Sequence, residues 1–209
     1  MPAYQQRLLI AFTLVAAVSC LNPPYPDQLM LQHIPTVLLL TALLLSRKLW
    51  TLSKQSFTLI VIYLALHAIG ARYIYSYVPY DDWSISLIGV SINTIFGTTR
   101  NGYDRLVHFA FGLLFLLPVR ELLLKNTRAS QRLSNYISLE FIMASSMLYE
   151  LFEWLLAIVL SPENAEAYNG QQGDLWDAQK DMSCALIGGI LALSMILMRK
   201  WLGAREPNV

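Results

Sequence analysis

Ionisable side chains recur at helical spacing inside three apolar segments, where they could hold a metal ion or move a proton. Asp104 and His108 are four residues apart, so a helix places them on one face. Glu150 and Glu153 are three residues apart in a second segment, and Asp181 lies at the start of a third. A charged group at the centre of a membrane helix costs about 2.5–3.5 kcal/mol, which makes such residues functional candidates. We therefore expect these five residues to be catalytic.

The same residue types are those that bind divalent cations. Mixed carboxylate and imidazole ligands suit Mg²⁺, Mn²⁺ or Zn²⁺, so a divalent metal ion is the expected cofactor. If a helix begins near Gly173, Asp174, Asp177 and Asp181 form one acidic stripe on it. The candidate metal ligands are Asp104, His108, Glu150, Asp177 and Asp181.

Several carboxylates this close together require nearby positive charge, because like charges and burial both disfavour the ionised form. That charge can come from a metal, a shared proton or arginine side chains. Arg72, Arg100 and Arg105 lie beside the acidic segments, and guanidinium groups bind phosphate. We expect these arginines to bind substrate phosphate, with pairing to the acids or to lipid phosphates as the alternative. Acids at a helix start can also act only as caps or dipole partners, and His67 can be a satisfied polar contact.

The composition is that of an integral membrane protein. The 209 residues are 56% hydrophobic and 14% charged, against roughly 45–50% and about 25% in soluble domains. The formal net charge is +1, which implies no nucleic-acid partner. Cys20 and Cys184 are too few for a disulfide framework or a cysteine zinc site.

We predict an all-α polytopic bundle of six transmembrane helices that forms a single domain over residues 1–209. Crossing the hydrocarbon takes about 20 apolar residues, and the first of the six segments is the shortest. No internal repeat is visible. The predicted spans are about 6–22, 29–46, 56–76, 104–124, 136–160 and 180–199.

Positive charge is concentrated at one set of span ends. Eleven of the 15 lysines and arginines lie there: Arg7, Arg47, Lys48, Lys54, Arg120, Lys125, Arg128, Arg132, Arg199, Lys200 and Arg205. The positive-inside rule then predicts that both termini are cytoplasmic. The acids and imidazoles would face the exterior.

The predicted outer loop 77–103 contains an apolar stretch, 83–96, that is too short to span a membrane. Its residues Trp83, Leu87 and Ile95 fall near helical spacing. We expect one interfacial or re-entrant helix on the outer leaflet.

The N-terminal segment has two interpretations. Arg7, the apolar run 8–18 and Cys20 could form a signal peptide that ends in a lipoprotein-type cysteine. We favour a retained first transmembrane helix, because Ala17 stands where such a cleavage motif prefers a larger aliphatic residue.

Three strings carry a family resemblance. YDRLVHF (103–109), YELFEW (149–154) and GDLWDAQKDM (173–182) resemble the YjdF-type family of bacterial inner-membrane proteins of unknown function. The resemblance covers nearly the whole chain. It implies a multi-pass protein of the bacterial inner membrane.

A more distant similarity is to VanZ-like proteins, which carry an Asp-Lys-x-x-His helix start, a later intramembrane Glu and a final Asp-x-x-x-Asn-x-x-Gly helix. Segment 104–108 matches the first element, with arginine in place of lysine. Glu150 or Glu153 matches the second. Segment 181–188 matches the third, except that Ala185 replaces the asparagine.

Three functions are compatible with this pattern. The first is a membrane-embedded hydrolase or transferase for a lipid or cell-envelope precursor, using a metal or a glutamate general base. The second is a small proton-coupled transporter, although repeated halves are not visible. The third is a structural or accessory protein whose acids and arginines only tie helices together. Membrane lipids are the expected partners in each case.

Overall fold

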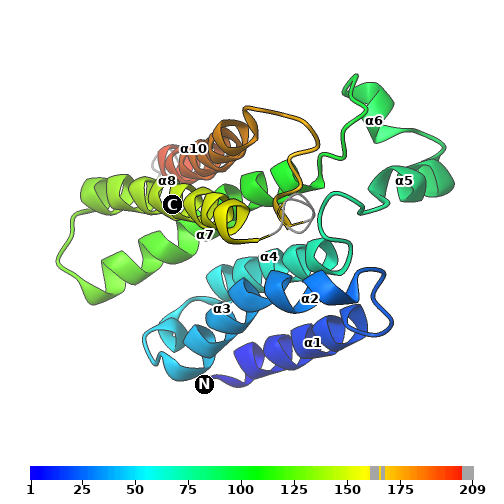
Figure 1. Cartoon of the computed structure of the whole chain (residues 1–209). Coiled ribbons are helices and arrows are strands. Elements are labelled where there is room, and N and C mark those ends of the chain that lie inside the picture. Colours follow the sequence, from blue (N-terminus) through cyan, green and yellow to red (C-terminus); the bar gives the residue numbers. More distant parts are fainter. Residues whose placement is uncertain (161–164, 166–167, 204–209) are drawn as a thin grey trace.

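The computed structural model describes residues 1–160, 165 and 168–203, and these form helices and connections without a strand (Figure 1). The all-α prediction is therefore confirmed. The helices are α1 (Ala3–Ser19), α2 (Pro26–Gln32), α3 (Ile34–Leu45), a 3₁₀ turn (Leu49–Thr51), α4 (Lys54–Arg72), α5 (Tyr80–Ile88), α6 (Ile92–Ile95), α7 (Tyr103–Asn126), α8 (Gln131–Val159) and α10 (Asp177–Gly203).

Five helical stretches among the described residues are long and apolar enough to cross a membrane. They are Pro26–Leu45, Lys54–Arg72, Tyr103–Asn126, Gln131–Val159 and Asp177–Gly203. The remaining predicted span corresponds to α1, which has 17 residues and falls short of these five in length. Five spans are thus supported, and the sixth stays a prediction.

The first of the five stretches consists of two helices that meet at His33. Pro35 lies in the first turn of α3, and a proline there has no N–H to continue the hydrogen-bond ladder from the preceding turn. That N–H would have bonded to the Leu31 carbonyl, and at the same break the neighbouring Gln32 carbonyl accepts a hydrogen bond from His67 Nε2 of α4, at 3.1 Å. The break between α2 and α3 therefore provides a hydrogen bond to α4.

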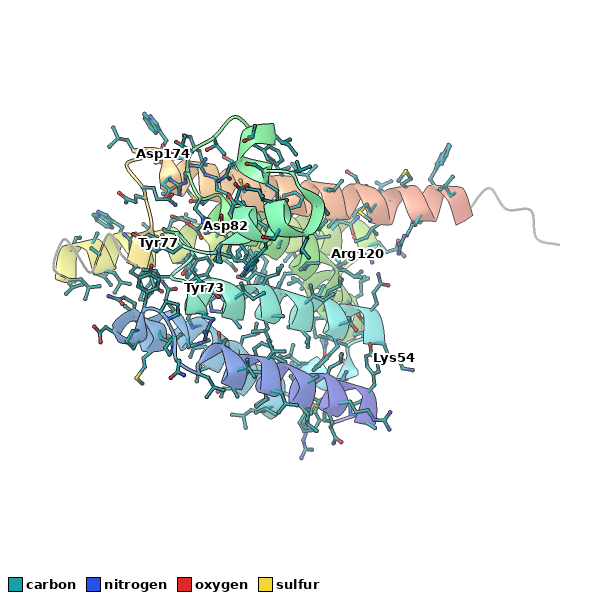
Figure 2. The ribbon with its side chains drawn as sticks, turned by 90° about the vertical axis from the view of Figure 1, so that its right-hand side faces the viewer. Lys54, Tyr73, Tyr77, Asp82, Arg120 and Asp174 are labelled. Carbon is teal, nitrogen blue, oxygen red and sulfur yellow. The ribbon has the colours of Figure 1, made fainter. Side chains whose placement is uncertain are left out.

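The long helices alternate in direction, so their ends collect in two layers. Gln5 Nε2 near the start of α1 donates to the Leu52 carbonyl just before α4, and Lys200 Nζ of α10 donates to Gln131 Oε1 of α8. We call this the basic end; Figure 2 shows Lys54 there, on the right. The opposite end, which we call the acidic end, carries Tyr73, Tyr77 and Asp174 on the left of Figure 2.

Helix α7 is the centre of the bundle. It contacts α4 on one side and both α8 and α10 elsewhere, while α1 contacts α4. Figure 1 shows the resulting two groups, α1–α4 and α7, α8 and α10. Their shared core includes Phe57, Leu64, Phe115, Ile142 and Ala185.

Helices α7 and α10 run in the same direction and touch backbone to backbone. A Cβ atom at Gly112 would lie 1.9 Å from the Ala185 carbonyl oxygen, and one at Gly188 would lie 2.1 Å from that of Phe109. Small residues permit such close approach in membranes, where packing replaces the hydrophobic effect between helices. This crossing lies about two to three turns from the acidic start of each helix, so it sets the two starts side by side.

The segment between α4 and α7 differs from its prediction. The sequence indicated one helix over 83–96, whereas the structure has α5 and α6 (Figure 1). Gly89 takes a left-handed conformation, φ 71°, which ends α5, and Ser91 caps α6 by accepting from Thr94 N. Asp81 links α5 to α6 by accepting hydrogen bonds from Ser91 Oγ and Asn93 N. The prediction of a single helix was wrong because Gly89 favours a turn there.

The glycine contact can be tested with Gly112→Ala. The added methyl group cannot fit against the Ala185 carbonyl, so α7 and α10 must separate. We expect a loss of about 1–3 kcal/mol in stability, the usual range for overpacking. Thermal unfolding in detergent measures it. Gly203→Ala is the control, since its Cβ would meet nothing within 4 Å; equal effects of the two changes would contradict the packing.

Candidate functional site

Three of the predicted site residues meet at the acidic end. Asp104 and His108 of α7 and Asp181 of α10 each offer a ligand atom, and these atoms all lie within 4.8 Å of one another. His108 Nε2 is 3.7 Å from Asp104 Oδ1, as expected for residues that share a helix face. Asp181 is only 2% exposed. We call these three residues the acid–histidine cluster.

Helix α8 brings its two glutamates to the same region. Glu150 Oε1 lies 3.4 Å from His108 Nε2, and Glu153 is buried one turn further along. Glu150 Oε1 and Asp181 Oδ1 are both buried and accept no hydrogen bond from any described residue. The cluster therefore has acceptor atoms that are not satisfied within the described chain.

Two of the three predicted phosphate-binding arginines lie beside the cluster, already paired with acids. Arg100 Nη2 is 2.6 Å from Asp177 Oδ1. Arg105 Nη2 is 2.5 Å from Asp174 Oδ2 and 3.3 Å from Asp177 Oδ1. Arg105 Nε, which makes no hydrogen bond within the described chain, points toward Asp181 Oδ1 at 3.9 Å. Asp177, predicted as a metal ligand, is thus engaged by both arginines.

Asp174 lies outside the helix that was expected to contain it. Helix α10 begins at Asp177, so Asp174 lies in the turn before the helix and the predicted helical stripe keeps only Asp177 and Asp181. Asp174 instead caps the entry to the helix by accepting from Trp176 N at 3.1 Å. Hydrogen bonds from Lys180, Trp176 and Arg105 hold the pKa of the Asp174 carboxyl well below its usual range.

Arg72 does not join this group. Its Nη1 donates to the carbonyl oxygens of Ser19 at 2.7 Å and Leu21 at 2.9 Å. Arg72 therefore holds the connection between α1 and α2 against the end of α4.

A cavity of about 170 Å³ opens beside the cluster. Asp104 and His108 form part of its wall, together with His67, Tyr75 and Tyr149. The cavity joins the acid–histidine cluster to residues of α4 and of the segment that follows it. A small polar group can therefore contact Asp104 and His108 from this side.

His67 and Tyr75 form a buried pair in that wall. The Gln32 carbonyl can only accept, so His67 Nε2 carries the proton and Nδ1 accepts from the Tyr75 hydroxyl. Tyr75 has a φ of 54° and turns back under α4. A Cβ at Gly70 would lie 2.5 Å from the Tyr75 ring, so Gly70 makes room for it. His67 is thus a satisfied polar contact.

Sequence reasoning missed three residues of this site. Ser146 Oγ lies 3.5 Å from His108 Nδ1, and the Tyr149 ring packs edge-on against the imidazole at 5.8 Å between centroids. Both could have been found, because Ser146 lies four residues before Glu150 and Tyr149 four residues before Glu153 on one helix. Tyr75 carried no such signal, since it follows a helix end.

Arg105 gives a test of the ion-pair network. Arg105→Lys keeps the charge but replaces a fork that reaches three aspartates with one ammonium group. We expect a loss of about 1.5–3 kcal/mol in unfolding free energy, the range for hydrogen bonds to charged groups, measured by thermal unfolding in detergent. Arg128→Lys, at an exposed arginine of the basic end, is the control. An unchanged melting temperature in Arg105→Lys would contradict the network.

Comparison with known proteins places this chain in a family. The model of the predicted membrane protein family DUF2238 matches residues 4–201. Inner membrane protein YjdF of Escherichia coli (strain K12) is 31% identical over 157 residues, which are 75% of this chain and 71% of YjdF. No solved structure matches the chain, and the similarity to VanZ-like proteins stays a prediction. The predicted YjdF-type resemblance is confirmed, and the chain belongs to the DUF2238 family of predicted membrane proteins.

Proposed function

We propose that this protein is a metal-dependent hydrolase or transferase of the bacterial inner membrane, acting on a phosphate-bearing lipid or cell-envelope precursor at the outer face. The single observation that carries the proposal is the meeting of Asp104, His108 and Asp181 within 4.8 Å. The similarity to an inner membrane protein supports the location.

The donor set favours a hard or borderline divalent cation. Two carboxylates and one imidazole are typical ligands of Mn²⁺ or Zn²⁺ in sites that keep a position open for water or substrate. The unsatisfied Asp181 Oδ1 supports this choice, because a buried acceptor without a partner is costly. Asp177 would act indirectly, by orienting Arg100 and Arg105.

A cation at this position would polarise a phosphoryl oxygen and promote ionisation of a bound water or hydroxyl group. Glu150, next to His108, is placed to accept the proton of that nucleophile. The nucleophile's oxygen would then bond to phosphorus as the bond to the leaving oxygen breaks, and the leaving oxygen would take the bonding electron pair and the proton that Glu150 received. Arg105 is the nearest guanidinium to the cluster and would bind the phosphate oxygens.

The size of the cavity limits which part of a substrate can enter. About 170 Å³ is below the roughly 300–1,000 Å³ of sites that enclose drug-sized ligands. We infer that only the phosphate-bearing part of a head group enters this cavity, while acyl chains stay in the bilayer.

A structural role is the second candidate, and the arginine pairs favour it. Arg100 and Arg105 link the start of α7 to the start of α10 through Asp174 and Asp177. If this were the whole role of the acids, neutral isosteres within the cluster would change stability and nothing else. Metal content separates the two roles.

We predict that the basic end is cytoplasmic and that the acidic end faces outward. In a chain whose two cysteines are replaced by serine, Arg128→Cys should react in intact cells only with a membrane-permeant maleimide. Leu87→Cys, exposed on α5, should also react with an impermeant one. The reverse labelling pattern would place the site in the cytoplasm and remove the outer-face assignment.

The metal proposal predicts about one divalent ion per chain after purification in detergent. Asp104→Asn, His108→Ala and Asp181→Asn should each lower the metal content at least tenfold, because a three-ligand site is lost when one ligand is removed. Elemental mass spectrometry measures the content, and thermal unfolding checks that each variant folds.

Asp82→Asn is the matched control, since Asp82 is an exposed acid on α5. Parent protein that binds no divalent ion, even when reloaded after chelation, would end the metal proposal. If the folded ligand variants keep the parent's metal content, Asp104, His108 and Asp181 are not the metal ligands.

A further inference from the structure

A second cavity, of about 310 Å³, lies between α8 and the start of α10. Its walls include Glu150, Glu153 and Trp154 of α8, Asp177 of α10, and Asn169 from the connection between them. We call it the lateral cleft. Glu150 belongs to its wall and also faces His108 at 3.4 Å, so the lateral cleft borders the acid–histidine cluster.

Two residues in the wall of the lateral cleft carry buried hydrogen-bond acceptor atoms that no described residue satisfies. Glu150 is 8% exposed and Asn169 is 5% exposed, yet neither Glu150 Oε1 nor Asn169 Oδ1 accepts a hydrogen bond within the described residues. Asn169 Nδ2 donates to the Glu153 carbonyl at 3.1 Å, which fixes how the amide is turned. The missing partner is therefore a hydrogen-bond donor.

The charge of the wall defines that donor further. Three carboxylates line the lateral cleft, from Glu150, Glu153 and Asp177, and its described lining contains no lysine or arginine. Of these acids Asp177 is held by Arg100 and Arg105, whereas Glu150 has only His108 beside it and Glu153 has no ion pair among the described contacts. A ligand that carries positive charge and several N–H donors fits this wall, which describes a primary ammonium group.

The rim of the lateral cleft adds an aromatic face and an approach from the bilayer. Trp154 is 64% exposed and Leu151 is 48% exposed on α8, and both line the cleft. An indole attracts a cation positioned over its ring. Exposed apolar side chains on a membrane helix face lipid, so a lipid head group can enter from the side.

We propose that the lateral cleft binds the primary ammonium group of an aminophospholipid. This inference rests on the proposed function, because Glu150 separates the ammonium position from the acid–histidine cluster where the phosphate of the same head group would lie. It names the substrate class as a phospholipid that carries both an amine and a phosphate. A soluble phosphorylated amine has the same two groups, and the experiment below distinguishes the two sources.

The test uses the full chain in a neutral detergent and native mass spectrometry. Phosphatidylethanolamine should bind at least tenfold more tightly than phosphatidylcholine, whose trimethylated amine has the same charge but no N–H donors. Glu153→Gln should weaken phosphatidylethanolamine binding about tenfold. Glu140→Gln, the same change at an exposed position of α8, should leave it unchanged.

Trp154→Leu is a second variant that should fold even if Glu153→Gln does not, because this exposed residue can be replaced without disturbing the core. It should weaken phosphatidylethanolamine binding two- to fivefold, as expected for an exposed cation–π contact. Soluble phosphoethanolamine is added as a competitor, and the metal content is measured in the same samples.

Equal binding of phosphatidylethanolamine and phosphatidylcholine, or full binding by folded Glu153→Gln, would overturn the ammonium site. Displacement of the lipid by an equal concentration of phosphoethanolamine would overturn the lipid source and assign a soluble amine. Selective phosphatidylethanolamine binding without metal would support the lateral cleft and reject the proposed metal chemistry. Metal binding without selective lipid binding would support the metal site and reject the ammonium site in the lateral cleft.

Discussion

The backbone contact between α7 and α10 is the constraint on which the other features of the acidic end depend. Gly112 and Gly188 let two parallel helices touch without side chains between them, and their acidic starts then lie about two to three turns away. Asp104 and His108 consequently face Asp181. A wider spacing of the helices would leave the three residues as separate polar groups in an apolar bundle.

The low dielectric constant of the bilayer interior explains why the charged residues of the acidic end form two groups, one at the helix starts and one deeper in the bundle. Arg100 and Arg105 neutralise Asp174 and Asp177 at the helix starts, where water and head groups also screen charge. Among the described contacts, the deeper carboxylates of the acid–histidine cluster meet a single guanidinium group, that of Arg105, whose Nε lies 3.9 Å from Asp181 Oδ1. Buried carboxylates in this condition need a cation or a proton, and this need is the physical basis of the proposed metal.

Much of this arrangement was predictable, because membrane helices follow simple rules of length and periodicity. The pairing of Asp104 with His108 follows from spacing alone, and the concentration of cations at one end follows from loop charge. The helix break at His33 and the two helices in place of one near Gly89 were harder, since they depend on single turn conformations.

Other parts of the site could not be predicted, because they depend on contacts between helices. Nothing in the spacing shows that Arg105 rather than Arg72 lies beside the cluster, since Arg72 bonds to carbonyls of a distant connection. The return of Tyr75 to His67 likewise depends on a left-handed turn and on the space above Gly70. Helical periodicity places residues on a face, but tertiary packing decides what that face meets.

The origin of the acid–histidine cluster in three helices has a consequence for biosynthesis. A chain emerges from the ribosome N-terminus first, so α7 and α8 enter the membrane before α10 has been made. During this interval Arg105 lacks the three aspartates that it reaches in the finished protein, and His108 has near it only Asp104 of its own helix and Ser146 and Glu150 of α8. Insertion of α10 supplies Asp174, Asp177 and Asp181 together. Completion of the cluster is therefore tied to a late step of translation, and a nascent chain released before that step would hold unpaired charge within the bilayer.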